Sequence, residues 1–195
     1  MSLLNEKRLA LMLLLYAPGA TGQTNEPVEG ITRLQKLMFL LNKEHKVTST
    51  LKTIDFTAYA FGPFSPELYD EIAFLRNMGL LASADTVDGR VQERPSRDAF
   101  EAENEQDLYD YLMGDVAENV PDSYQTEKFS LSQRGIDEVQ GKLKASRGNS
   151  DVDSVMAAIT DIKVRFNSVP LRALIRYVYE NYPKYAENSI IANRI

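Results

Sequence analysis

Apolar residues recur at intervals of three or four positions along much of this chain, the spacing that places them on one face of a helix. Near the start, Leu9, Met12 and Tyr16 show the pattern. The stretches that it predicts to be helical are residues 4–16, 31–45, 66–78, 105–118, 132–145, 150–166 and 170–182. Most of the chain is therefore expected to be α-helical.

Shorter stretches show the alternation typical of a β-strand. Residues 56–61 alternate and predict a strand with both faces partly covered, and residues 129–131 are also strand-like. Residues 80–82 and 91–93 flank an Asp-Gly pair at 88–89, which is typical of a β-hairpin. A two-stranded hairpin is therefore expected after the third helix.

The segment 62–67, with the sequence GPFSPE, separates the predicted strand from the third helix. Gly62 and Pro63 are expected to turn the chain. Ser65 is expected to cap the helix, and Pro66 suits its first position. This segment predicts a sharp corner between strand and helix.

The order of these elements is helix, helix, strand, helix and hairpin, which is the order of a winged helix-turn-helix with the hairpin as its wing. We expect a mainly α fold of the α+β class, with the winged helix over residues 1–97. Residues 98–127 are expected to form an acidic segment, and residues 128–195 a helical C-terminal lobe packed on the winged helix.

Composition narrows the chemistry available to this fold. Among 195 residues there are no Cys, no Trp and one His, which excludes disulfides, thiol catalysis and zinc–cysteine sites. The sequence has no Gly-rich phosphate loop and no paired-carboxylate motif. We therefore expect a protein that is not an enzyme and that binds neither a cofactor nor a metal ion. His45 is expected to complement the negative end of helix 31–45.

The N-terminus raises a question of targeting. Lys7 and Arg8 before the apolar run 9–17 faintly match a secretory signal. The run is far too short for a membrane span, Glu6 is unusual before such a run, and Pro18 is poorly placed for cleavage. A first core helix is the simpler interpretation, and it predicts a cytoplasmic protein that enters no membrane.

Charge is distributed unevenly. The chain carries a net charge of −6, yet residues 98–127 contain ten acidic residues, Asp107 and Asp110 among them, and no Lys or Arg. Such a run is typical of a solvated insertion. The alternatives are a surface that docks a basic partner and a cover over a basic patch of the same molecule.

Two motifs resemble a known family. Residues 33–39 read RLQKLMF and residues 59–69 read YAFGPFSPELY, which is similar to the winged-helix group of YwgA-like proteins and the Panacea (SocA-like) antitoxin domain. The resemblance covers about residues 5–95. It implies a small α-rich winged helix without catalytic residues, and an antitoxin role exerted by contact with another protein. The chain lacks the Trp that Panacea domains usually carry, and Phe64-Ser65 is closer to the YwgA-like subgroup.

Aromatic residues supply the candidate protein-interaction sites. Phe64 and Tyr69 either fill the core around the predicted corner or form an exposed docking surface. Tyr182 and Tyr185 belong to a cluster of tyrosines with nearby arginines, a composition enriched at protein interfaces. The same cluster suits base stacking in single-stranded nucleic acid, or simple packing of the last helix.

Basic residues supply the alternative, a DNA-binding regulator. Arg33, Lys36 and Lys43 are expected to line helix 31–45, where they would contact phosphates or pair with the acidic segment. Arg90 and Arg94 lie in the predicted wing. Helix 65–78 carries a net charge of −2, so the usual reading helix of a winged helix would repel DNA.

The sequence therefore favours a protein-interaction module over a DNA-binding regulator. The expected partner is a protein, such as a basic protein or a toxin, and a homodimer is also compatible with the sequence. DNA is disfavoured by charge.

Overall fold

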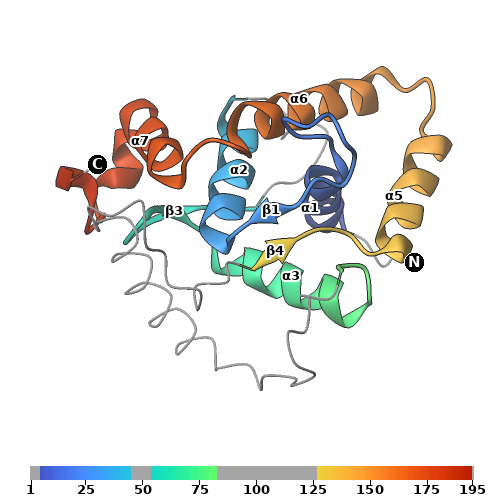
Figure 1. The fold of residues 1–195 in the computed structure, drawn as a ribbon, viewed down its shortest axis with the longest axis horizontal. Helices are drawn as coiled ribbons and strands as arrows, with labels where there is room; N and C mark the ends of the chain where they lie inside the picture. Colours follow the sequence, from blue (N-terminus) through green and yellow to red (C-terminus); the bar gives the residue numbers. More distant parts are fainter. Residues whose placement is uncertain (1–4, 45–53, 83–126, 195) are drawn as a thin grey trace.

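The computed structural model describes residues 5–44, 54–82 and 127–194. Over these ranges the chain is mainly helical, with two small antiparallel sheets of two strands each (Figure 1). The helices are α1 (Glu6–Tyr16), α2 (Ile31–Glu44), α3 (Pro66–Asn77), α5 (Gln133–Ala145), α6 (Ser150–Phe166) and α7 (Leu171–Asn181), followed by the short 3-10 helices η3 (Pro183–Ala186) and η4 (Ala192–Arg194). The mainly α class expected from the sequence is confirmed.

Helix boundaries agree closely with the periodicity. Each of these six helices begins and ends within two residues of its expected range. Local signals explain this: the Ser132 side chain accepts a hydrogen bond from Gly135 N, and the Asn149 side chain accepts one from Asp151 N. The predicted helix 105–118 and the predicted wing, with Arg90 and Arg94, lie outside the described residues.

Helix α1 is at the centre of the molecule rather than on its surface. Residues 10–15 are all buried, so this part of α1 is covered on every side. Lys163 of α6 is fully buried and donates hydrogen bonds of 2.7 Å to the carbonyls of both Leu15 and Ala17. Those carbonyls lie at the end of α1, where no further helical turn supplies donors, so Lys163 caps α1.

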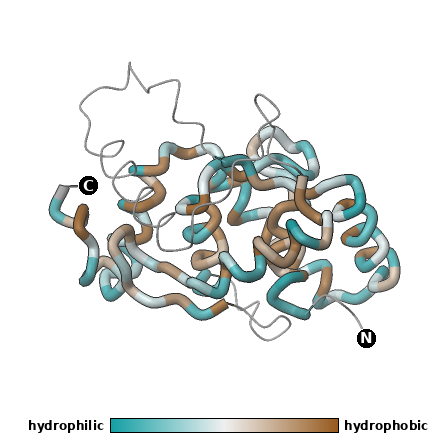
Figure 2. Tube along the Cα trace, turned by 90° about the horizontal axis from the view of Figure 1, so that it is seen from below, coloured by the Kyte–Doolittle hydropathy of each residue, from teal (hydrophilic) through white to brown (hydrophobic). Residues whose placement is uncertain are grey.

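Helix α2 packs against α6, α7 and the β2–β3 hairpin. Leu34, Leu37 and Phe39 are fully buried and belong to the same core as α1. Figure 2 shows hydrophobic stretches of the tube concentrated inside and hydrophilic stretches along the periphery. Within the described ranges, no helix is long and apolar enough to cross a membrane.

The first sheet joins distant parts of the chain. Strand β1 (Val28–Glu29) pairs antiparallel with β4 (Lys128–Phe129), with Val28 opposite Phe129. Beside it, Leu81 forms a β-bridge with Leu131. The half of the predicted wing hairpin that the structure describes, residues 80–82, is therefore paired with residues 130–132. The N-terminal and C-terminal parts of the chain share one core.

The second sheet corrects the expected corner at residues 62–67. Strand β2 (Thr57–Tyr59) pairs with β3 (Gly62–Phe64), and the turn lies at Ala60 and Phe61. The predicted single strand 56–61 is thus the first half of a hairpin. Gly62 has φ of +93°, a conformation that residues with a side chain rarely adopt, and this lets the chain leave the turn as a strand.

Candidate interaction surface and the α2–hairpin junction

The two motifs at residues 33–39 and 59–69 lie side by side, because α2 contacts the end of the β2–β3 hairpin. The side-chain amide of Gln35 donates to the Ser65 carbonyl and accepts from the Ser65 backbone N–H, each at 3.0 Å. Gln35 is 2% exposed. A buried pair of reciprocal hydrogen bonds fixes the start of α3 relative to α2.

The expected cap of α3 is wrong. Ser65 occupies the N-cap position, but its side chain makes no capping hydrogen bond, and its buried hydroxyl has no hydrogen-bond partner in the structure. The Gln35 side chain engages the Ser65 backbone instead. Pro66 does take the first helical position.

Lys36 lies in the same junction. Its side chain is buried, with the residue 3% exposed, and Nζ donates a hydrogen bond of 3.1 Å to the Pro63 carbonyl. Burial lowers the pKa of Lys36 to about 7, because desolvation disfavours the charged ammonium. The lysine is therefore a packing and hydrogen-bonding element between α2 and β3.

Three rings of the hairpin and α3 form a row, which we call the aromatic surface: Tyr59, Phe64 and Tyr69. The ring centroids of Tyr59 and Phe64 are 4.9 Å apart, and those of Phe64 and Tyr69 are 5.8 Å apart. Tyr59 is 41% exposed, whereas Phe64 and Tyr69 are half-buried. The structure thus brings the candidates Phe64 and Tyr69 together and adds Tyr59, which the sequence analysis did not select.

The C-terminal segment borders this surface. The Ile190 backbone N–H donates to the Ala60 carbonyl at 3.0 Å, and the Asn188 side chain donates to the Ala58 carbonyl at 3.2 Å. The segment therefore lies along the edge of β2 that does not pair with β3. Ile190 is 55% exposed.

The other candidate tyrosines pack on the core. The rings of Tyr182 and Tyr185 meet Phe39 edge-on, with centroids 5.1 Å and 4.6 Å away. Lys43 stands over the Tyr185 ring at 5.4 Å. Tyr182 and Tyr185 therefore attach the C-terminal segment to α2, which is the packing alternative weighed for them.

A surface polar cluster ties α2 to α6 and α7. The Tyr177 hydroxyl donates to Glu44 at 2.8 Å, and Arg165 donates to another oxygen of Glu44 at 2.6 Å. Partial burial and the nearby Glu44 carboxylate raise the pKa of Tyr177. The arrangement is a set of matched charges and hydrogen bonds, and it secures the helix ends.

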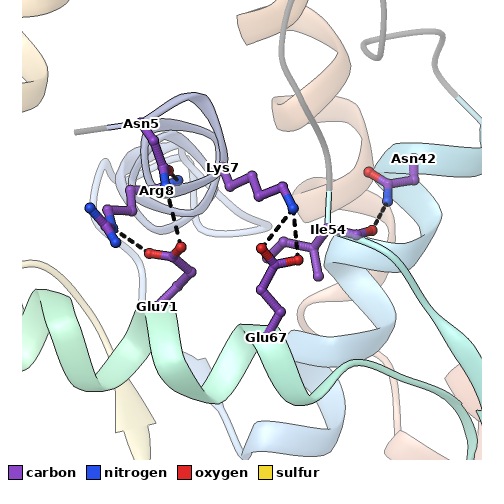
Figure 3. Close-up of polar contacts among 7 residues, drawn as sticks. All are labelled: Asn5, Lys7, Arg8, Asn42, Ile54, Glu67 and Glu71. Carbon is purple, nitrogen blue, oxygen red and sulfur yellow. Dashed lines mark hydrogen bonds and ion pairs between the residues drawn. The ribbon is translucent and has the colours of Figure 1, made fainter.

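The acidic residues of α3 are held by α1. Lys7 binds Glu67 at 2.6 Å, and Arg8 forms an ion pair with the largely buried Glu71 (Figure 3). The Asn5 side chain also donates to Glu71, and the Arg8 guanidinium stacks 3.7 Å above the Phe74 ring. Much of the negative charge on α3 is therefore neutralised within the fold.

The expected basic stripe on α2 is wrong. Lys36 is buried, and Arg33 donates hydrogen bonds of 2.9 Å and 2.8 Å to the carbonyls of Phe166 and Val169. Lys43 is exposed. Helix α2 is an interior helix, because residues 34–41 are all buried. Arg33 and Lys36, two of the three cations expected to contact phosphate, therefore make internal contacts instead.

The remaining candidates fall outside the described ranges: Asp107, Asp110, Arg90, Arg94 and His45. Glu127, the last acidic residue of the acidic segment, is described and forms an ion pair with Arg76 of α3. In the described parts, no group of three or more His, Asp or Glu side chains is placed to hold a metal ion.

Comparison with known proteins adds no assignment. No family model matches the chain, and neither a curated protein nor a solved structure matches it.

Proposed function

We propose that this protein is a non-enzymatic interaction module, similar in role to Panacea-type antitoxins and adaptors, that binds another protein through the aromatic surface. The observation that carries the proposal is the row of Tyr59, Phe64 and Tyr69, with centroid spacings of 4.9 Å and 5.8 Å. Aromatic rings are the side chains most enriched at the centres of protein interfaces.

The hairpin gives this surface a rigid base. Gln35 and Lys36 hold its α2-facing side, and the segment around Asn188 and Ile190 holds the β2 edge. A preorganised surface loses little conformational freedom on binding, so more of the contact energy appears as affinity.

Charge selects the kind of partner. Asp70 follows Tyr69 and is exposed, Asp55 precedes β2 and is exposed, and the whole chain carries a net charge of −6. Lysine and arginine side chains bind both carboxylates and aromatic faces. We therefore propose a basic segment of a partner protein as the occupant of the aromatic surface.

The proposal includes the winged-helix architecture over residues 1–97. The order of the elements supports this architecture: α1, α2, the β2–β3 hairpin, α3 and then the extended segment 80–82. In this architecture α3 would be the reading helix of a DNA-binding protein. The ion pairs of Glu67 and Glu71 with α1 occupy α3 with internal contacts, which favours the protein-binding role.

The test places a photo-crosslinking amino acid at position 59 of the full chain in its native cell. A matched variant carries it at Val164 of α6, which is 45% exposed, similar to Tyr59 at 41%. We expect a partner captured from position 59 and not from position 164. The captured protein is then purified and titrated calorimetrically with the unmodified chain.

We expect Tyr59→Ala with Tyr69→Ala to weaken that affinity at least tenfold, about 1.4 kcal/mol, and Val164→Ala to leave it unchanged. Equal affinity of the double variant would contradict the proposal. Sequence-selective, nanomolar binding to duplex DNA that is lost in Lys43→Ala, which removes an exposed cation of α2, would instead support the regulator.

A further inference from the structure

The amine of Lys36 is enclosed between α2 and the hairpin that carries Phe64. Within the described residues, its hydrogen-bond acceptor is the Pro63 carbonyl, at 3.1 Å. Gln35, one residue earlier on α2, holds the Ser65 backbone, two residues after Pro63. The contact of α2 with β3 therefore depends on two adjacent polar side chains, of which one is ionisable.

Among the residues that the structure describes, no acidic side chain is placed to compensate the charge of this amine. Strand β3 carries no ionisable side chain, and Glu29 of β1 pairs with Lys128. On α6 and α7, Arg165 pairs with Asp161 and Glu44, and the Tyr177 hydroxyl also binds Glu44. Tyr179 shares a hydrogen bond with Ser189, and Lys163 binds the end of α1. Arg172, Arg176 and Glu180 of α7 are exposed. Glu67 at the start of α3 pairs with Lys7.

The two protonation states of Lys36 make different demands on this enclosure. A neutral amine has two donors and no charge, whereas an ammonium has three donors and a charge, so burial with the single acceptor at Pro63 penalises the ammonium more. Desolvation is the cause that lowers the pKa of Lys36 to about 7. Both states are therefore populated near neutral pH, and the protonated one favours access of water to Nζ.

We propose that Lys36 is a proton-controlled latch that holds the β2–β3 hairpin against α2 when neutral and loosens it when protonated. Acidification would thereby displace Phe64 and change the aromatic surface that a partner meets. Only this consequence for partner binding rests on the proposed function. The movement itself needs no partner. Loosening breaks the Lys36–Pro63 contact and hydrates the amine.

A single tryptophan reports on the movement, because the chain contains no Trp of its own. In the full-length Phe64→Trp variant, we expect the fluorescence emission to shift to longer wavelength as the pH falls from 8.5 to 5.5. The shift should follow a one-proton titration with its midpoint near 7, the pKa of Lys36. Circular dichroism across the same range should show unchanged helix content.

Matched variants assign the titration. Methionine has a shape similar to lysine but does not titrate. In the Phe64→Trp variant that also carries Lys36→Met, the pH-dependent emission shift should therefore disappear. It should persist with Lys163→Met, which removes a second buried lysine, at the end of α1. It should also persist with His45→Gln, which removes the only histidine of the sequence.

An emission maximum independent of pH, or a titration retained in the Lys36→Met background, would overturn the latch. If Phe64→Trp does not fold, Tyr59→Trp on β2 replaces it as the reporter, and Lys36→Gln replaces Lys36→Met if the latter does not fold. Because this measurement uses no partner, its failure leaves the proposed function standing, and loss of partner binding leaves the latch standing.

Discussion

Lys36 and Lys163, the buried lysines of the described ranges, differ in what surrounds their amines. Lys163 donates to two carbonyls, those of Leu15 and Ala17, and the charge of Glu26 partly offsets its burial. Lys36 has the Pro63 carbonyl and no such opposing charge. Burial lowers the pKa of Lys163 to about 8 and that of Lys36 to about 7. The difference follows from how well each ammonium is solvated by the protein.

The first prediction concerns the pH dependence of stability. Both lysines bind a proton up to about pH 10.5 when unfolded and release it near pH 7 and 8 when folded. The unfolded chain thus binds more protons between pH 7 and 9.5, so the free energy of unfolding should rise with pH there. Each neutral lysine contributes roughly 1 kcal/mol per pH unit.

Urea unfolding followed by circular dichroism measures this rise. Lys36→Met should remove the part of the slope that begins near pH 7, and Lys163→Met the part that begins near pH 8. A slope that is the same in wild type and both variants would show that other groups cause it.

A second prediction tests the Gln35 clamp. Gln35→Leu leaves the buried N–H and carbonyl of Ser65 without their partner. We expect a loss of about 2–4 kcal/mol in the free energy of unfolding, since each unpaired buried group costs about 1–3 kcal/mol. The same substitution at Gln140, whose amide makes a 3.4 Å contact with the Tyr16 hydroxyl, is the control and should cost under about 1 kcal/mol.

Glycine 62 supports a third prediction. A Cβ there would lie 2.7 Å from Cε1 of Tyr179, in addition to the strain of φ +93°. Gly148 has φ of +85° and open space around it. Gly148→Ala should cost about 1–2 kcal/mol from the backbone alone, and Gly62→Ala should cost clearly more. Equal losses in thermal unfolding would mean that Tyr179 moves aside freely.

At the scale of elements, the α1–α3 contact combines two ion pairs of different burial. The Lys7–Glu67 side chains are 25% and 36% exposed, and those of Arg8 and Glu71 are 24% and 7% exposed. Solvent screens the first pair well. The second also includes the stacking of Arg8 on Phe74 and so fixes the angle between the helices more strongly.

The fourth prediction is a pair of double-mutant cycles built on alanine substitutions. The Lys7–Glu67 coupling should be about 0.2–1 kcal/mol and fall as salt is added. The Arg8–Glu71 coupling should be larger, about 1–3 kcal/mol, and less sensitive to salt. A reversed order of the two couplings in urea unfolding at 50 mM and 500 mM NaCl would refute the assignment.

The helices could be predicted from the sequence because their signals are local. Periodicity places the boundaries within two residues, and the caps Ser132 and Asn149 mark the starts of α5 and α6. The β2–β3 hairpin could not be predicted, because Gly62 and Pro63 are typical of a turn, whereas in the structure they belong to β3 and Gly62 pairs with Tyr59. Pairing across a short sheet depends on what packs against it, here α2.

The candidate site could be predicted only in part, because the burial of its residues also depends on which elements pack together. Phe64 and Tyr69 are predictable because one lies within the predicted corner and the other just after it, and the structure places their rings 5.8 Å apart. The burial of Lys36 could not be inferred, since its place one turn after Arg33 suits an exposed cationic face equally well. Its burial follows from β3, which packs against α2 and supplies the Pro63 carbonyl to the amine.

At the scale of the whole molecule, the C-terminal segment completes the fold rather than trailing from it. Tyr182 and Tyr185 cover Phe39 of α2, while Asn188 and Ile190 bind the β2 edge. This one segment therefore supports both the core and the base of the aromatic surface.

The fifth prediction follows from this double role. Tyr185→Ala should lower the free energy of unfolding by about 3 kcal/mol, because it removes a ring from the Phe39 contact. Tyr185→Phe keeps the ring and should cost less than about 1 kcal/mol.

The edge contact of the same segment is tested by deleting residues 187–195. This deletion should speed amide exchange at the β2–β3 hairpin more than at α1, as measured by mass spectrometry. Uniform acceleration would contradict a local role.

The capping of α1 by Lys163 also bears on how the chain is made. The bonds from Lys163 to Leu15 and Ala17 span 148 and 146 residues. At translation rates of about 5–20 residues per second, the ribosome delivers α6 roughly 7–30 s after α1. During that interval the apolar stretch 10–15 has no native cover from the C-terminal half. A nascent chain stalled before residue 163 would present this stretch to chaperones, and release of α6 would end their engagement.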